Sequence, residues 1–290
     1  MDSSIFSGAC TAMITPFKDG KIYYPMVEQL LRRQIDSGIR TVVLAGTTGE
    51  SPTLSDLEKI TLLERSKQFT GDTCRLILGT GSNSTEHAVI LSEKAQQAGA
   101  DGLLLVSPYY NKANPDGLYM HYWTIAQHIS VPGILYNVPS RTGVDIPISV
   151  YEQLSKLPVY IGVKEAGTDL GKITETLTVC PKHFKIWSGN DNLIVPVMSV
   201  GGCGVISVLS NICPQETNEL CCAALSGDFK RAATLQKRLL PLIKLLFCEV
   251  NPLPVKYAMG VLGYDCGPCR LPLTHLTEEH KKKIYDYLTQ

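Results

Sequence analysis

The feature of this sequence that most constrains its fold is a repeat of short, strand-like apolar runs separated by segments with helical spacing. The runs start between residue 8 and residue 204, at an average spacing of 28 residues, about the length of one strand plus one helix. Strands that alternate with helices form a parallel sheet, and eight strands are the number that closes a barrel. We therefore predict an α/β fold, a (β/α)8 TIM barrel, with strands at residues 8–17, 41–45, 75–79, 102–106, 133–137, 160–165, 184–188 and 204–208.

Capping signals mark the helices between these strands. Ser55, followed three residues later by Glu58, forms a capping box and predicts a helix that begins just after it. Ala88, Leu91 and Ala95 keep helical spacing, and Gly99 suits the end of that helix. A doubly wound open sheet would also alternate strands and helices, but no Gly-x-Gly-x-x-Gly opens the first helix, so we favour the barrel.

The residues after the eighth strand show the spacing of helices rather than strands. Segments 228–247 and 277–288 are periodic, and segment 253–262 carries Pro254 in its first turn. We expect these helices to pack beside the barrel as a C-terminal extension. The chain then divides into a barrel domain, residues 1–225, and a helical domain, residues 226–290.

Charge and composition exclude several classes of partner. Lys plus Arg and Asp plus Glu number 27 each, with no long run of either sign, so the basic stripe of a nucleic-acid-binding protein is absent. No apolar stretch is long enough to cross a membrane, and we expect a cytoplasmic protein. Cys266 and Cys269 have a thioredoxin-like spacing but lie near the C-terminus rather than at a strand-to-helix junction, so we expect reduced, structural thiols.

Lys164 is the least expected residue at the ends of the predicted strands, where barrel enzymes place their chemistry. It lies in a mostly apolar strand, and strand alternation puts the small residues Gly162 and Ala166 on its face. If this face points into the barrel, burial disfavours the ammonium and makes the neutral, nucleophilic amine available. Lysines are rarely buried, so a surface lysine at a strand end is the alternative.

Further polar residues follow the neighbouring strands. Tyr136 ends the strand before that of Lys164, where its phenol could transfer protons, although a core tyrosine would give the same pattern. Thr47 and Thr48 lie in a glycine-containing turn that could hold a carboxylate or merely connect a strand to a helix. Arg141 could pair with a second carboxylate through two hydrogen bonds, or lie solvated in its loop.

No metal site is evident in the sequence, and we expect no cofactor. The six histidines form no His-x-x-x-His pair, and none lies right at a strand end. A metal-dependent aldolase would need histidine and acidic ligands at the barrel mouth. His121 and His128, seven residues apart on one helix, are expected at the surface or at an interface.

Four segments make the sequence resemble the dihydrodipicolinate synthases (4-hydroxy-tetrahydrodipicolinate synthases), a family of the N-acetylneuraminate lyase superfamily. They are GTTGE at 46–50, YNVPSRTG at 136–143, GVKE at 162–165 and NPLPVK at 251–256, and the similarity runs from about residue 8 to the C-terminal helices. The resemblance implies a (β/α)8 barrel with a C-terminal helical domain. It also implies the condensation of pyruvate with L-aspartate 4-semialdehyde, a step of lysine and diaminopimelate biosynthesis.

The same resemblance implies roles for particular residues. Lys164 would form the pyruvate imine, which tautomerises to an enamine before carbon–carbon bond formation, transimination and cyclisation. Tyr136, Thr47 and Tyr110 would form a proton relay, with Tyr110 reaching in from a neighbouring subunit of a homotetramer of paired dimers. The substrates would be bound by Thr48 at the pyruvate carboxylate, by Arg141 at the semialdehyde carboxylate, and by the carbonyls of Gly189 and Ile206 in the pocket wall.

Arg141 separates this function from related ones. Sialate lyases and sugar-acid aldolases share the lysine and the tyrosine but usually lack an arginine in this loop, and a planar cation suits an aldehyde that carries a carboxylate. Another pyruvate-dependent aldolase is therefore the second hypothesis. A catalytically silent relative with a binding or assembly role is the third, and the complete set of Lys164, Tyr136, Thr47 and Tyr110 argues against it.

Regulation is where the chain departs from part of the family. Many relatives are inhibited by L-lysine in a cleft between subunits, and three residues here match positions that line it: Ser51, Asn83 and Tyr109. Sensitive bacterial relatives carry histidines in place of Asp56 and Lys59, and a glutamate that pairs with the effector's amino group in place of His87. Because Lys59 adds a positive charge near a cationic effector, we predict weak or no inhibition by L-lysine.

Overall fold

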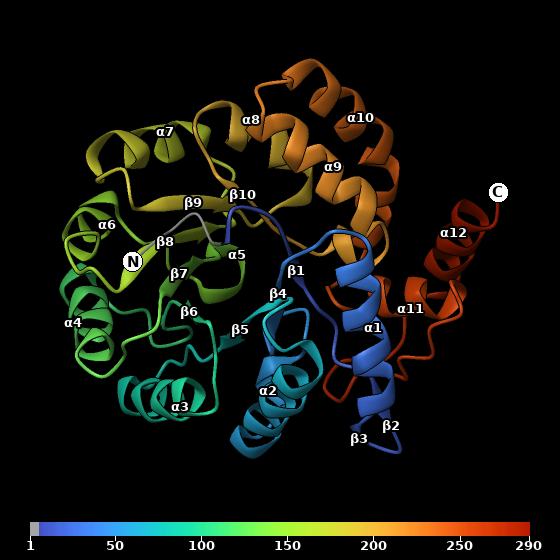
Figure 1. Ribbon diagram of the computed structural model, residues 1–290, viewed down its shortest axis with the longest axis horizontal. Helices are drawn as coiled ribbons and strands as arrows, with labels where there is room; N and C mark the ends of the chain where they lie inside the picture. The colour runs from blue at the N-terminus through green and yellow to red at the C-terminus, as the bar shows by residue number, and fades with distance from the viewer. Residues whose placement is uncertain (1–5) are drawn as a thin grey trace.

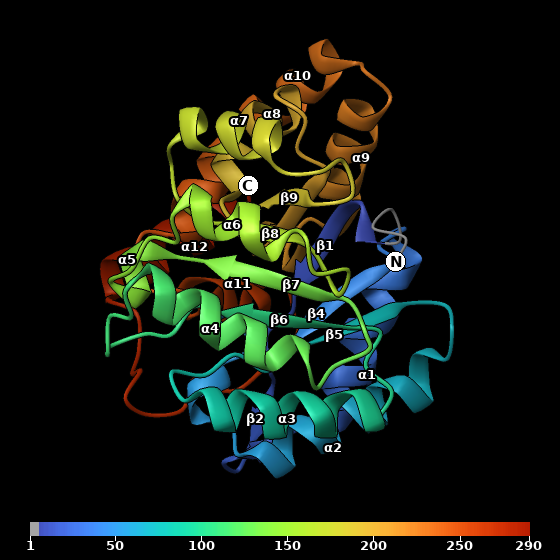
Figure 2. The same cartoon turned by 90° about the vertical axis from the view of Figure 1, so that its left-hand side faces the viewer.

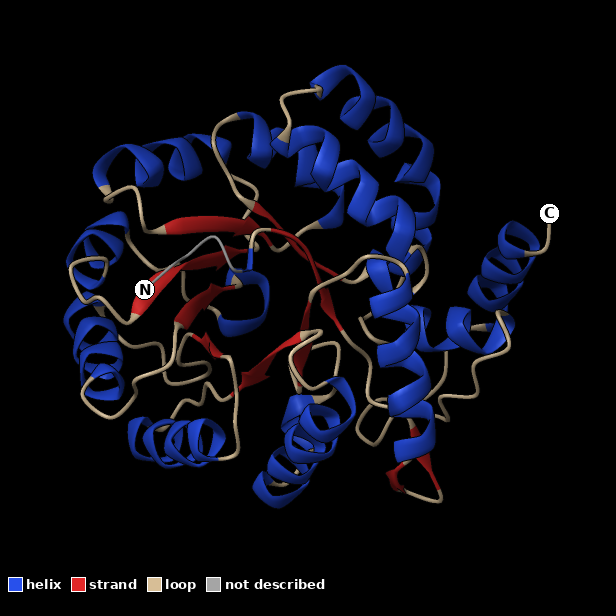
Figure 3. Ribbon diagram, viewed as in Figure 1, coloured by secondary structure: helices blue, strands red, loops and turns tan. Residues whose placement is uncertain are grey.

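Residues 6–290 are described by the computed structural model, in which eight parallel strands close into a barrel surrounded by helices (Figures 1 and 3). The predicted TIM barrel is confirmed. Around it the hydrogen-bonded order is β1 (Gly8–Ala12), β10 (Gly204–Ser207), β9 (Lys185–Ser188), β8 (Tyr160–Glu165), β7 (Gly133–Asn137), β6 (Gly102–Val106), β5 (Arg75–Gly79) and β4 (Thr41–Leu44), which pairs back onto β1.

The first predicted strand, 8–17, was too long. β1 ends at Ala12, and Phe17 begins a separate hairpin formed by β2 (Phe17–Lys18) and β3 (Lys21–Ile22). Pro16 lies between the two elements, and proline lacks the N–H group that a strand interior needs for its ladder. The bounds of the other seven barrel strands differ from the predicted ones by at most one residue.

The helices that cover the barrel begin at recognisable caps. Ser55 and Glu58 form the predicted capping box, with the Glu58 N–H 3.2 Å from Ser55 Oγ and the Ser55 N–H 2.9 Å from Glu58 Oε2. The helices of the barrel layer are α1 (Tyr24–Asp36), α2 (Asp56–Thr70), α3 (Thr85–Gln97), α4 (Pro115–Ala126), α6 (Ile148–Leu154), α7 (Leu170–Val179), α8 (Ile194–Ser199) and α9 (Pro214–Leu225), and one-turn α5 (Pro139–Thr142) follows β7.

Three more helices follow the barrel, as the spacing after the eighth strand predicts. They are α10 (Phe229–Leu246), α11 (Leu253–Val261) and α12 (Glu278–Leu288), and they extend to one side of the barrel in Figure 1. α10 packs against α9 and α8, and α11 packs against α10 and α12. Our division of the chain into residues 1–225 and 226–290 stays a proposal; it falls in the turn between α9 and α10.

The barrel interior is filled with side chains. Val43, Ile77, Leu104 and Ile134, from four adjacent strands, belong to one buried cluster there. Trp187 of β9 is fully buried in the same cluster, and its Nε1–H donates to the Phe6 carbonyl at 2.8 Å. Because the interior is packed, a substrate must bind at the ends of the barrel rather than in its centre.

A β-bulge in β8 shifts the strand that carries the candidate lysine. Gly133 pairs with Tyr160 but Ile134 pairs with Gly162, so Ile161 is the extra residue. A bulge adds one residue and re-aims those that follow. Gly162 lies so close to β9 that a Cβ there would be 2.0 Å from the Lys185 carbonyl oxygen, which requires glycine. Simple alternation along the strand did not reveal this irregularity.

The carboxyl ends of the strands meet at one end of the barrel. Figure 2 shows the arrowhead of β7 directed toward α5, which follows that strand after Val138. The turn after β4 and the C-terminal residues of β8 lie at this same end, since all eight strands are parallel. The residues predicted to carry out chemistry come from these positions.

Candidate active site

Lys164 lies inside the barrel mouth, beside Tyr136. The two residues are paired in register between β8 and β7, and Lys164 Nζ lies 4.4 Å from the centroid of the Tyr136 ring. Lys164 is only 5% exposed, and its amine makes no hydrogen bond or ion pair with another of residues 6–290. The arrangement therefore presents a buried amine, free to react, next to a phenol that can exchange protons.

Asp191 is a buried carboxyl on which the charge of Lys164 acts. Its Oδ2 accepts the N–H groups of Val208 and Leu209 at 3.0 and 2.9 Å, while Oδ1 has no partner within residues 6–290. Burial raises the pKa of the Asp191 carboxyl, and hydrogen bonds and the charge of Lys164 oppose this. Asp191 follows the seventh predicted strand, 184–188, so its place at the barrel mouth is expected from the sequence, although no role for it is.

Glu165, the residue after Lys164, anchors the end of β8. Its carboxylate accepts Asn137 Nδ2–H at 2.8 Å, the Tyr151 hydroxyl at 3.1 Å and the Gly167 N–H at 2.7 Å. Burial raises the pKa of this carboxyl, and the donated hydrogen bonds oppose the increase. The network ties β8 to β7 and α6, and it fixes the backbone from which Lys164 projects.

A cavity of about 380 Å³ opens at this end of the barrel. Thr47, Tyr136 and Arg141 border it, together with Val138 and Thr142. The structure thus brings together three of the residues that the sequence analysis selected. Lys164 is not among the residues that line the cavity, but its amine lies against the ring of Tyr136, which does.

The turn that carries Thr47 and Thr48 is held from both sides. The Thr15 hydroxyl donates to the Gly49 carbonyl at 2.7 Å, and Asn251 Nδ2 donates to Thr48 Oγ1 at 3.0 Å. Thr48 is buried and not in the cavity wall, but its own O–H remains available as a donor. Glu50 ends the turn in the left-handed conformation, with φ of 58°.

Arg141 lies on α5 at the edge of the cavity. Its Nη2 donates to the carbonyl of Asn251 at 3.1 Å, and the other N–H groups of its guanidinium bind none of residues 6–290. Asn251 therefore contacts both Arg141 and Thr48, although it follows them by more than one hundred residues. Sequence spacing held no signal for this bridge.

Three of the remaining selected residues do not join the cavity. Tyr110 is 91% exposed, on a loop where its φ is 72°, and it does not reach the cavity of its own chain. Gly189 donates its N–H to the Glu165 carbonyl at 2.7 Å, and Ile206 is buried in the barrel interior. A Cβ at Gly189 would lie 2.7 Å from Ala166 Cβ, so glycine allows this close approach.

The same cavity is bordered by two of the three residues selected as an effector cleft. Ser51 and Tyr109 border it, whereas Asn83 does not, and the Asn83 carbonyl accepts Asn111 Nδ2–H at 2.9 Å. His87 Nε2 lies 2.9 Å from an Asp56 carboxylate oxygen, and His87 Nδ1 lies 3.1 Å from Ser82 Oγ. Asp56, His87 and Lys59 border the cavity as well.

The sequence also predicted where two histidines lie, that the cysteines are reduced, and that the chain has no metal site and no membrane span. His121 and His128 were expected on one helix, at the surface or at an interface, but α4 ends at Ala126, before His128. His128 is exposed, whereas His121 is buried with its ring packed edge-on against Tyr122, and burial lowers its pKa to about 4. The ten cysteines are free, and burial raises the pKa values of Cys266 and Cys269 to about 12, which leaves them poor nucleophiles. Within residues 6–290, no cluster of three His, Cys, Asp or Glu residues is arranged to hold a metal ion. Over the same range, no helix is long and apolar enough to span a membrane.

Comparison with known proteins agrees with this arrangement. The model of the dihydrodipicolinate synthetase family matches residues 5–290. A curated relative from Acetivibrio thermocellus, named 4-hydroxy-tetrahydrodipicolinate synthase, is 42% identical over 99% of this chain and 99% of its own. A solved dihydrodipicolinate synthase from Thermotoga maritima matches with a TM-score of 0.96 at 37% identity, covering 98% of each chain. Another, from Cyanidioschyzon merolae with lysine bound, matches with a TM-score of 0.95 at 35% identity, also covering 98% of each chain.

Proposed function

The chain belongs to the dihydrodipicolinate synthetase family, and from that premise we propose that it condenses pyruvate with L-aspartate 4-semialdehyde to form 4-hydroxy-tetrahydrodipicolinate. It is an enzyme of the Schiff-base lyase class. The observation that supports this most is the buried amine of Lys164, which has no hydrogen-bond partner among residues 6–290 and lies against the Tyr136 ring.

The proposed reaction begins at Lys164. Its neutral amine adds to the keto carbon of pyruvate, and loss of water from the carbinolamine leaves an imine. Loss of a proton from the pyruvate methyl group gives an enamine, whose carbon attacks the aldehyde carbon of the second substrate. The amino group of that substrate then displaces Lys164 by transimination, which closes the ring and restores the free amine.

Each of these steps moves a proton, and we assign the first transfers to the phenol of Tyr136, whose ring lies against Lys164. Thr47 borders the same cavity and can pass a proton onward. We assign the last position of this relay to Tyr110 of a second subunit. Its near-complete exposure and its distance from its own cavity support that assignment.

Two anionic groups need partners in this reaction. The Thr48 hydroxyl, which accepts from Asn251 and keeps its own O–H free, would donate to the pyruvate carboxylate. Arg141, at the cavity edge, would pair with the carboxylate of the semialdehyde through two charge-assisted hydrogen bonds. The carbonyls of Gly189 and Ile206 complete the proposed pocket. An arginine at this edge suits a small carboxylate substrate better than a polyhydroxylated sugar acid.

Assembly and location are part of the same proposal. If Tyr110 completes the site of a second chain, the smallest active unit is a dimer, and we propose a homotetramer of two such dimers. A cytoplasmic location agrees with a biosynthetic role in lysine and diaminopimelate formation. No cofactor takes part in the proposed steps, since the imine of Lys164 supplies the electron sink.

A comparison of substrates tests the proposed function. With pyruvate present, the enzyme should consume L-aspartate 4-semialdehyde, and it should neither form nor cleave N-acetylneuraminate at a comparable rate. Arg141→Lys serves as the matched variant, because it keeps the charge but loses the planar pair of donors. Efficient turnover of N-acetylneuraminate with no use of the semialdehyde would assign the chain to an aldolase instead.

A further inference from the structure

Asn251 lies just before α11 and contacts both of the residues that we assign to the substrate carboxylates. Its Nδ2 lies 3.0 Å from Thr48 Oγ1, and its main-chain carbonyl accepts Arg141 Nη2–H at 3.1 Å. The residue is buried, and Lys256 of α11 binds Glu50 at the other end of the same turn. Because the contact with Thr48 uses the side chain and the contact with Arg141 uses the backbone, a substitution of Asn251 removes only the first.

The contact with the Asn251 amide determines what the Thr48 hydroxyl can do. An amide nitrogen only donates, so Asn251 Nδ2 supplies a hydrogen to Thr48 Oγ1 and does not accept the hydrogen of the hydroxyl. The Thr48 hydroxyl donates to no other of residues 6–290, and its hydrogen stays available. An amide in the reverse orientation would accept that hydrogen and leave none for a carboxylate.

The other atom of the amide is unfavourably placed in this orientation. Asn251 Oδ1 is shielded from solvent and accepts no hydrogen bond from residues 6–290. A buried acceptor without a donor destabilises the folded state, and an apolar side chain of similar size, such as leucine, would avoid that loss. Packing alone therefore does not explain an asparagine at this position, whereas its hydrogen bond to Thr48 does.

We propose that Asn251 is a positioning residue for pyruvate binding: its side chain turns the Thr48 hydroxyl so that the hydrogen faces the bound carboxylate. The inference rests on the proposed function, since it takes Thr48 as the donor to pyruvate. Asn251 itself does not line the cavity and acts only through Thr48. A donor that is oriented before the ligand arrives binds it more tightly than one that rotates freely, because less conformational entropy is lost on binding.

Imine trapping with pyruvate alone tests the proposal without the second substrate. The measured quantity is the pyruvate concentration that gives half of the maximal borohydride-trapped adduct. Asn251→Ala removes the orienting donor and leaves the Thr48 hydroxyl free to rotate, so this concentration should rise about threefold to tenfold. Asn251→Asp keeps the shape of the side chain but accepts the Thr48 hydrogen and adds a negative charge, so the rise should be at least about fivefold larger than for Asn251→Ala.

Two further variants separate orientation of the hydroxyl from packing. Thr48→Val removes the hydroxyl that Asn251 orients, so adding Asn251→Ala to it should change the half-saturating concentration by less than about twofold. Asn251→Leu keeps most of the side-chain volume without a donor, so it should behave like Asn251→Ala, and it provides the contrast if Asn251→Asp does not fold. A role in packing predicts instead that Asn251→Leu resembles the unchanged protein.

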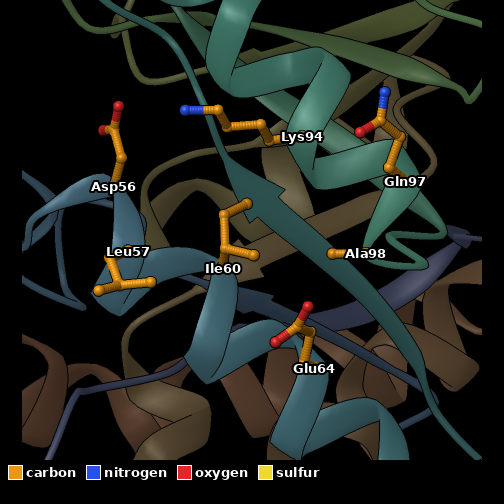
Figure 4. A pocket seen from close by; sticks show the side chains of 7 residues that line it. All are labelled: Asp56, Leu57, Ile60, Glu64, Lys94, Gln97 and Ala98. Atoms are coloured by element: carbon orange, nitrogen blue, oxygen red, sulfur yellow. The ribbon is translucent and has the colours of Figure 1, made fainter.

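The control makes the same amide-to-carboxylate change at a distant residue. Gln97 is exposed on the last turn of α3, in a groove between α2 and α3 that lies outside the cavity at the barrel mouth (Figure 4). Gln97→Glu should trap pyruvate like the unchanged protein. In steady-state assays at saturating pyruvate, Asn251→Ala should keep its KM for the semialdehyde, because the main-chain carbonyl that accepts from Arg141 is retained.

Three results would overturn the proposal. They are an Asn251→Asp variant that binds pyruvate as well as Asn251→Ala or better, an Asn251→Leu variant that matches the unchanged protein, and an equal effect of Asn251→Ala with and without the Thr48 hydroxyl. If the unchanged chain formed no pyruvate adduct at all, the proposed function on which the inference rests would be wrong.

Discussion

The buried pair of Glu50 and Lys256 allows a quantitative prediction about how the C-terminal helices support the active site. Lys256 lies on α11, and Glu50 is the last residue of the turn that carries Thr47 and Thr48. Both side chains are almost completely shielded from solvent. All three donors of the Lys256 ammonium are used, and Glu50 Oε2 accepts the Arg270 N–H at 2.8 Å.

Replacing Lys256 with Met, which has a similar length and no charge, leaves the Glu50 carboxylate buried with only that backbone N–H as donor. It also leaves the carbonyls of Thr15 and Pro268 without their charged donor. Breaking a buried ion pair on one side costs about 3–5 kcal/mol of unfolding free energy. Glu50→Gln should cost a similar amount, because it leaves the Lys256 ammonium without its counterion. The double variant should lose less than the sum of the two, since it removes both charges.

Urea unfolding followed by circular dichroism, on both single variants and the double variant, measures these differences. Lys244→Met is the matched control, because Lys244 is exposed on α10, and its change should stay within about 0.5 kcal/mol. In steady-state assays, Lys256→Met should also raise the KM for pyruvate, since the Thr48 turn loses an anchor. A loss below about 1 kcal/mol for Lys256→Met, or strict additivity in the double variant, would refute the reasoning.

Three further predictions concern function. Mixing inactive Tyr110→Phe with inactive Lys164→Ala should regenerate activity, because a heterodimer then contains one site with neither defect. If mass spectrometry verifies subunit exchange and no activity is recovered, Tyr110 does not act in the partner's site. Arg141→Ala should reduce kcat/KM for the semialdehyde by roughly 10- to 150-fold, which corresponds to about 1.5–3 kcal/mol for one charged hydrogen bond. It should leave imine formation with pyruvate nearly unchanged, and an equal loss in both steps would show that Arg141 is structural. L-lysine should inhibit the enzyme weakly or not at all in a steady-state titration, and inhibition below millimolar lysine would contradict this. His87→Glu should increase the sensitivity to L-lysine, because it supplies a full negative charge for the effector's amino group.

The barrel could be predicted from the sequence because its signal is local and repeated. Each strand-plus-helix unit carries its own apolar run and caps, as at Ser55, and eight repeats of one pattern average out errors at single boundaries. The pairing of Lys164 with Tyr136 followed from the same pattern, since both end neighbouring strands. Boundaries were less certain where a proline interrupts, as between β1 and β2.

Features that depend on contacts between distant segments could not be predicted in this way. Asn251 reaches back to Thr48 and Arg141, and its side chain is more than two hundred residues from that threonine in sequence. The bulge at Ile161 depends on the pairing of two strands, not on either one. Burial of Lys59 and His121 depends on which face of each helix turns inward, and the weakly amphipathic sequences of α2 and α4 do not reveal that face.

In the proposed mechanism Lys164 forms an imine with pyruvate, and reductive trapping tests this step most directly. Borohydride should reduce the imine to a secondary amine, so a reduced pyruvyl group should appear by mass spectrometry on the peptide that contains Lys164. Lys164→Ala should abolish the adduct while circular dichroism shows an intact fold. Labelling of a different lysine, or no labelling of a preparation that turns over both substrates, would contradict the account.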